Sequence, residues 1–119
     1  MRLAEITEGY VYVLINPRFT DWIKVGKTNN IQTRLYSYQI ASPFRDYEIY
    51  YTKKFRDYGR AEKIALSKLK KKAEEQRGEW FKMDRDKAIP VINSISLPST
   101  EIDTYRRETT IGEENETNT

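Results

Sequence analysis

The chain has 119 residues, 13% of them aromatic, and a net charge of +3, which predicts one small domain with a modest core. It contains no cysteine and no histidine, which excludes disulfides, thiolate metal sites and nucleophiles activated by histidine. A metal site would have to use oxygen ligands, which favours Mg²⁺ or Mn²⁺, and a general base would have to be Tyr, Lys, Asp or Glu.

A β-hairpin is expected near the start of the chain. Residues 10–15, YVYVLI, are β-branched and aromatic and predict a strand. After an Asn-Pro break and a short loop, residues 21–26, DWIKVG, predict a second strand antiparallel to the first. Strand alternation places Lys24 and Gly26 on the same side of this hairpin.

A helix follows the hairpin. Asn29 is expected to be its N-cap, with Gln32 as the capping-box partner, and the helix is expected to run to about Gln39. Arg34 and Tyr38 are four residues apart, so they are neighbours on one face of this helix.

The remaining elements complete an α+β fold. Residues 46–53 predict a third strand, and residues 57–73 predict a long helix that its first residue can cap. Residues 79–83, EWFKM, predict a short strand or turn, and residues 84–95 a helical segment interrupted at Pro90. We therefore expect a small, mainly antiparallel three-stranded sheet flanked by helices.

The charge is divided unevenly along the chain. Residues 1–96 hold 19 Lys and Arg against 12 Asp and Glu, a balance of +7, and residues 97–119 hold 2 against 6, a balance of −4. We expect a basic domain over 1–96, suited to a polyanionic partner, and an acidic, disordered tail over 97–119. No apolar stretch approaches the ~20 residues of a membrane span, and no secretory signal is expected, so we expect a cytoplasmic protein.

Glu62 occupies an unusual position in the long helix. It lies near the middle of an apolar stripe formed by Tyr58, Ala61, Ala65, Leu66, Leu69 and Ala73. A buried carboxylate is costly unless a positive charge compensates it. An arginine, a lysine or a metal ion could do so, and an ordinary ion pair at the edge of the core is the plainer interpretation.

Six polar residues on the hairpin and the two helices are candidates for a functional site: Tyr12, Lys24, Lys27, Arg34, Tyr38 and Glu62. Each also has a plainer interpretation, since Tyr12 could belong to the core, the lysines could be solvated, and Arg34 could pair with Glu62. Gly26 and Lys27 precede a helix start, where backbone and charge can approach a phosphate, but the spacing of a Walker P-loop is absent.

The order of these motifs resembles the GIY-YIG nuclease superfamily. The resemblance rests on GYVYVL, then IKVGKTNNIQTRLYSY, then a glutamate in a second helix, and covers about residues 9–92. The second segment is similar to the nuclease domain of the bacterial excision-repair incision subunit, and EWF at 79–81 resembles a small phage-associated branch. One departure is Lys24, where the superfamily usually has tyrosine.

The resemblance implies a metal-dependent DNA endonuclease. Glu62 would hold Mg²⁺ (or Mn²⁺), and Arg34 and Lys27 would stabilise charge on the phosphoryl oxygens. Tyr12 would orient or deprotonate the attacking water, with Lys24 lowering its pKa, and Tyr38 would hold a phosphate or the water. DNA contacts are expected from Gly26, Lys27, Arg34, Lys53 and Lys54.

DNA is thus the expected partner, with no membrane and no small-molecule cofactor, in the host cytoplasm if the protein is phage-encoded. The oligomeric state stays open. The alternative is a non-catalytic nucleic-acid-binding module, or a phage regulatory protein, on the same fold. Such a protein would keep the basic surface but would not need Glu62.

Overall fold

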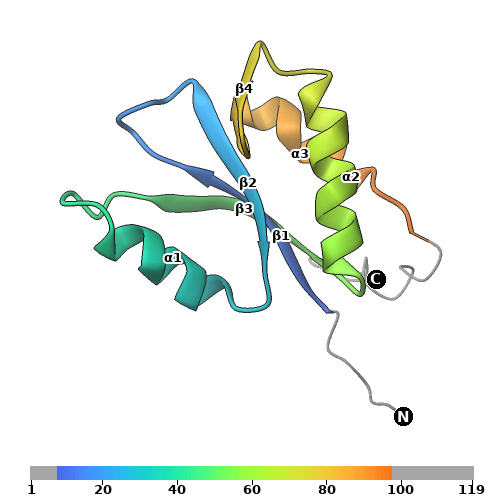
Figure 1. Cartoon of the computed structure of the whole chain (residues 1–119), viewed down its shortest axis with the longest axis horizontal. Coiled ribbons are helices and arrows are strands. Elements are labelled where there is room, and N and C mark those ends of the chain that lie inside the picture. The colour runs from blue at the N-terminus through green and yellow to red at the C-terminus, as the bar shows by residue number, and fades with distance from the viewer. Residues whose placement is uncertain (1–7, 98–119) are drawn as a thin grey trace, which may run out of the picture.

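A computed structural model describes residues 8–97 of the chain. The predicted acidic tail lies outside the described residues except for Leu97, which is buried in the core and belongs to the domain. The elements in chain order are β1 (Gly9–Ile15), β2 (Trp22–Thr28), α1 (Ile31–Ile40), β3 (Glu48–Phe55), α2 (Tyr58–Lys70), β4 (Glu75–Arg77), β5 (Trp80–Lys82) and α3 (Arg85–Asn93), as Figure 1 shows.

The sheet is antiparallel throughout and has the strand order β3-β1-β2-β5-β4. The predicted α+β class and the hairpin are confirmed, but the prediction of three strands was wrong. β4 was not predicted, and β5 was left undecided between strand and turn, because strands of three residues are too short to show the alternation that identifies a strand.

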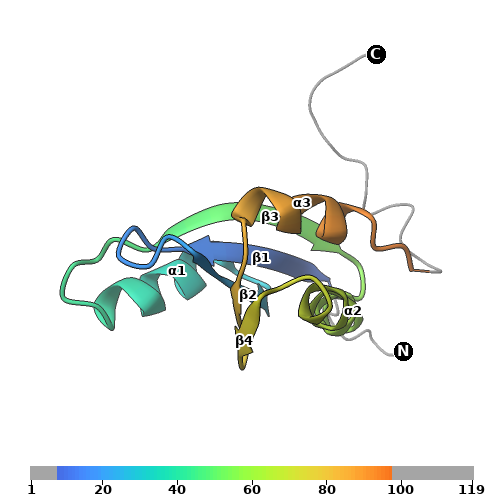
Figure 2. The same ribbon diagram turned by 90° about the horizontal axis from the view of Figure 1, so that it is seen from above.

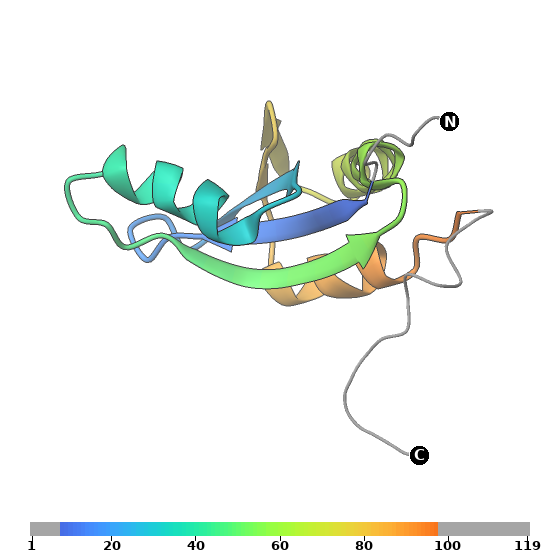
Figure 3. The ribbon, with the colours of Figure 1, turned by 90° about the horizontal axis from the view of Figure 1, so that it is seen from below.

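The two faces of β1 serve different purposes. Val11, Val13 and Ile15 face the main hydrophobic core, to which α2 and α3 contribute their apolar side chains. Tyr12 and Leu14 are buried on the opposite face. Figures 2 and 3 show α1 and α3 on opposite sides of β1 and β3, so α1 lies over the Tyr12 face.

The starts of α1 and α2 depend on side-chain caps. Asn30, not Asn29, caps α1, since its side chain accepts a hydrogen bond from the Thr33 amide at 3.0 Å. The predicted capping box was therefore wrong by one position, because β2 extends to Thr28 and delays the helix. Asp57 caps α2 as predicted, accepting from the Arg60 amide at 3.1 Å.

The last helix runs through its proline. α3 is continuous from Arg85 to Asn93 and includes Pro90, so the predicted interruption was wrong. Proline removes one helical hydrogen bond, but the next turn still closes, because the Ser94 amide donates to the Pro90 carbonyl at 3.0 Å. Burial of Ala88, Val91 and Ile92 holds the helix against the core and offsets the lost bond.

The pairing of Tyr12 with Gly26 gives a test of the packing on the α1 face. A Cβ atom on Gly26 would lie 2.5 Å from the Tyr12 hydroxyl oxygen and 2.7 Å from Cζ of the ring. Gly26→Ala should therefore force the ring to shift and lower the free energy of unfolding by about 1–3 kcal/mol, measured by urea denaturation.

Gly59→Ala is the matched control. Its Cβ would meet only the end of Lys27 at 3.5 Å and the Asp57 carboxylate at 4.0 Å, and replacing a helical glycine by alanine stabilises by up to about 1 kcal/mol. Equal stability of Gly26→Ala and wild type would show that the Tyr12 ring does not depend on Gly26.

Candidate functional site

Tyr12 lies at the centre of the α1 face of the sheet. It is 2% exposed, and α1 places Arg34 and Tyr38 beside it. Burial raises the pKa of the Tyr12 hydroxyl far above its usual value, the hydroxyl of Tyr38 raises it further, and the charge of Arg34 opposes this shift only in part. Tyr12 therefore keeps its proton at neutral pH.

Lys24 forms an ion pair with Glu79. Its ammonium group donates to Oε1 of Glu79 at 2.6 Å, and the Lys24 side chain is only 13% exposed. Lys24 is opposite Trp80 in the pairing of β2 with β5, and this pairing brings the neighbouring Glu79 to the lysine. Arg34 is the cation that lowers the pKa of Tyr12, and the role of Lys24 beside Tyr12 stays a prediction.

The structure gives a reason for a glycine at position 26 that the sequence did not indicate. It pairs with Tyr12 across the hairpin, and the Tyr12 ring crosses the space that a side chain at position 26 would fill. We expected this glycine to admit a phosphate. In the structure it admits the tyrosine ring, which can then reach α1.

Glu62 is buried as the apolar stripe predicts, at 8% exposure. Burial is the main reason that its pKa is raised, and the charge of Glu79 raises it further. Lys27 and Lys24 act in the opposite direction. The compensating cations are thus two lysines of β2. Within residues 8–97 no ion pair joins Glu62 to Arg34, so that plainer interpretation is not supported.

Glu79 is a site residue that the sequence analysis missed. Its backbone carbonyl accepts from the Val25 amide at 3.0 Å, and its carboxylate pairs with Lys24. Its charge also raises the pKa of both Tyr12 and Glu62. Glu79 therefore lies near both of these residues. The only local signal was an acidic residue just ahead of a short strand, and its neighbours are set by the pairing of β5 with β2.

The other predicted lysines divide into two groups. Lys27 is exposed at the end of β2, with its ammonium 5.8 Å from the centre of the Tyr58 ring and close enough to act on Glu62. Lys53 and Lys54 are consecutive on β3, so they face opposite sides of the sheet. Lys53 donates to the Asn93 carbonyl at 3.1 Å on the α3 side. We therefore correct the expectation that Lys53 and Lys54 together follow a DNA backbone.

The carboxylates of Glu62 and Glu79 could together hold a metal ion. Within residues 8–97 no three Asp, Glu, His or Cys side chains come together as a metal site. Mg²⁺, however, is commonly bound by one or two carboxylates, with water and substrate phosphates as its remaining ligands. The donor set therefore fits Mg²⁺ or Mn²⁺ and would leave room for a phosphate.

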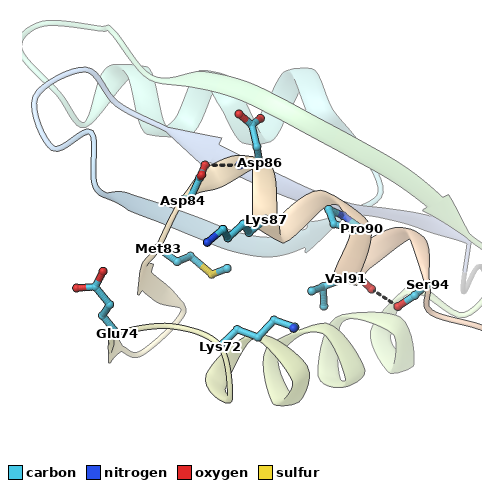
Figure 4. Close-up of a pocket in the computed structure, with 9 residues that line it drawn as sticks. All are labelled: Lys72, Glu74, Met83, Asp84, Asp86, Lys87, Pro90, Val91 and Ser94. Carbon is cyan, nitrogen blue, oxygen red and sulfur yellow. Dashed lines mark hydrogen bonds between the residues drawn. The ribbon is translucent and has the colours of Figure 1, made fainter.

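A pocket of about 720 Å³ lies elsewhere, between α3, the end of β5 and the turn after α2. Figure 4 shows Lys72, Met83, Lys87 and Val91 among the side chains around it. No predicted site residue lines this pocket. The candidate site is instead the corner formed by β1, β2, α1, α2 and Glu79.

Comparison with known proteins identifies the family of the chain. The T5orf172 domain family matches residues 9–96, and the chain belongs to this family. It is a phage-associated domain family, and membership suggests a nuclease-like or nucleic-acid-related role. No curated protein and no solved structure gives a significant match. Within the described part of the chain, no helix has both the length and the apolar character to cross a membrane.

The raised pKa of Glu62 predicts a pH dependence of stability. Because the folded protein binds this proton more tightly than the unfolded chain does, Glu62 favours folding at acid pH and loses that contribution as the pH rises through its folded pKa. In EDTA, Glu62→Gln should therefore match the wild type at about pH 4 and become relatively more stable towards about pH 7. Urea denaturation at several pH values measures the difference.

Glu48→Gln is the control, because Glu48 is exposed on β3. Its stability relative to wild type should change little over the same range. A Glu62→Gln variant that becomes relatively less stable as the pH rises would mean that the lysines outweigh burial, and would contradict the predicted sign.

Proposed function

We propose that this protein is a GIY-YIG-type, metal-dependent DNA endonuclease. The observation that carries the proposal is a buried carboxylate, Glu62, with the exposed Lys27 close enough to act on it. The exposed Arg34 acts on Tyr12, and the charge of Glu79 acts on both Tyr12 and Glu62. Membership of a nuclease-like domain family supports it. A purely structural role would favour an apolar residue at position 62, because burying a carboxylate destabilises the fold.

The basic residues of the site can bind the scissile phosphate. Arg34 presents a planar set of donors that matches two phosphate oxygens, and Lys27 supplies a point charge. Both are exposed, so a DNA backbone can reach them. Their charges favour the extra negative charge that develops on the phosphoryl oxygens during hydrolysis.

Tyr12 and Glu62 can complete the reaction. Since Tyr12 keeps its proton in the free protein, it acts as a hydrogen-bonding group that orients the attacking water, together with Tyr38. Glu62, assisted by its position beside Glu79, would hold Mg²⁺. When bound, this ion supplies the positive charge that stabilises the leaving oxygen.

DNA binding should be mainly electrostatic. Residues 8–97 hold 18 Lys and Arg against 11 Asp and Glu, a balance of +7, and neutralised phosphates release counterions. We expect the affinity for a short duplex to fall at least about tenfold between about 50 and 200 mM salt, whatever its sequence. Fluorescence anisotropy on two unrelated duplexes measures this, and tight binding to only one of them at the higher salt would contradict it.

Replacing Glu62 separates an endonuclease from a binding module. Glu62→Gln keeps the shape of the side chain but removes the ligand charge. We expect Mg²⁺-dependent nicking of a supercoiled plasmid to fall at least about a hundredfold, as when a key charge-stabilising group is lost. DNA binding should be retained or improved, because one negative charge near the phosphate is removed.

Two controls make this test decisive. Glu48→Gln, on the exposed surface of β3, should cut like the wild type, and EDTA should stop both. If the Glu62→Gln variant still nicks in a clean preparation, the proposed site is wrong. If the wild type binds DNA but never cuts it with Mg²⁺ or Mn²⁺, the protein is a binding module.

A further inference from the structure

The Glu62 carboxylate is poorly satisfied by the residues around it. The residue is more than nine-tenths buried, and within residues 8–97 it forms no ion pair. Its hydrogen-bond partner is another acid, the side chain of Glu79. Lys24 and Lys27 attract it only from a greater distance. Buried carboxylates normally have close partners, so this oxygen pair is suited to a ligand of positive charge.

A second carboxylate faces Glu62 at the same place. The Glu79 carboxyl group lies within hydrogen-bonding reach of that of Glu62, and its charge raises the pKa of Glu62. It is held by its backbone bond to Val25 at 3.0 Å and by Lys24 at 2.6 Å. The Glu79 side chain is 44% exposed, so solvent and ions can reach it. Two carboxylates that converge in this way would repel each other less if a cation lay between them.

We propose that Glu79 is the second carboxylate ligand of the divalent cation that Glu62 holds, and that Lys24 competes with this cation for Glu79. The inference rests on the metal dependence proposed above. Mg²⁺ and Mn²⁺ accept two carboxylates and keep further positions for water and phosphate. An ammonium group at 2.6 Å from Glu79 both occupies its oxygen and repels a dication.

The proposal predicts opposite effects for the two partners of one ion pair. Removing Glu79 takes away a ligand, whereas removing Lys24 takes away a competitor. If the pair served only to hold the site in shape, breaking it from either side would weaken cation binding. Lys24 and Glu79 can therefore be distinguished by cation binding, without any measurement of cleavage.

The test uses the full chain without DNA and follows Mn²⁺ binding by electron paramagnetic resonance of the free ion. Glu79→Gln should weaken binding at least about tenfold, and Lys24→Met should tighten it several-fold. Glu48→Gln and Lys68→Met, which change exposed residues elsewhere on the surface, should leave it unchanged. Melting curves in EDTA show that each variant is folded.

Three outcomes would overturn the inference. Equal Mn²⁺ binding by Glu79→Gln and wild type would show that Glu79 is not a ligand, while the proposed function would stand. Weaker binding by Lys24→Met, to the same extent as by Glu79→Gln, would show a structural pair. Absence of Mn²⁺ binding by the wild type would instead remove the metal dependence itself.

Discussion

The burial of one carboxylate, Glu62, determines how the rest of the site is arranged. A helix that places an acid inside its apolar stripe packs against a sheet only where cations are near, and here Lys24 and Lys27 of β2 provide them. With Glu79, this corner holds two acids and two lysines, so its formal net charge is zero. Lys24 is engaged by Glu79, and the pKa of Glu62 is raised, first by burial and then by the charge of Glu79.

The strand β1 joins this corner to α1, the helix that carries Arg34 and Tyr38. β1 gives its valines to the main core and Tyr12 to the opposite face, so one strand supports both the fold and the site. Gly26 allows Tyr12 to pack on that face, because a side chain at position 26 would clash with the Tyr12 ring. Since α1 has no fully buried residue of its own, its position depends on contacts such as that of Tyr38 with Tyr12 and, at 5.3 Å between ring centres, with Tyr47.

The features that could be predicted from the sequence are those that depend on local periodicity. The hairpin, the amphipathic α2 and the burial of Glu62 follow from alternation and helical spacing over seven or more residues. The resemblance to a nuclease superfamily added the set of six polar residues, and the structure places these around one face and corner. Their catalytic roles remain predictions, since position alone does not establish chemistry.

What the sequence could not predict depends on contacts between distant segments. Glu79 becomes part of the site only because β5 pairs with β2, and a three-residue strand offers no pattern from which to infer that pairing. The same contact pairs Lys24 with Glu79, a partner that the sequence analysis did not predict. The continuity of α3 through Pro90 is a further example, since tertiary burial of its apolar face overrode a local helix-breaking residue.

The surroundings of Tyr12 limit the chemical role that it can play. Burial and the hydroxyl of Tyr38 raise its pKa, and the charge of Arg34 opposes them only in part, so the phenol stays neutral at neutral pH. Tyr12 can nevertheless donate a hydrogen bond, and it can accept one while it remains neutral. A water held by such a group is oriented but not deprotonated. In the proposed reaction, the positive charge that activates this water would therefore come from Arg34 or from a cation held by Glu62. The proposed reaction thus depends more on the acid of α2 than on the tyrosine of β1.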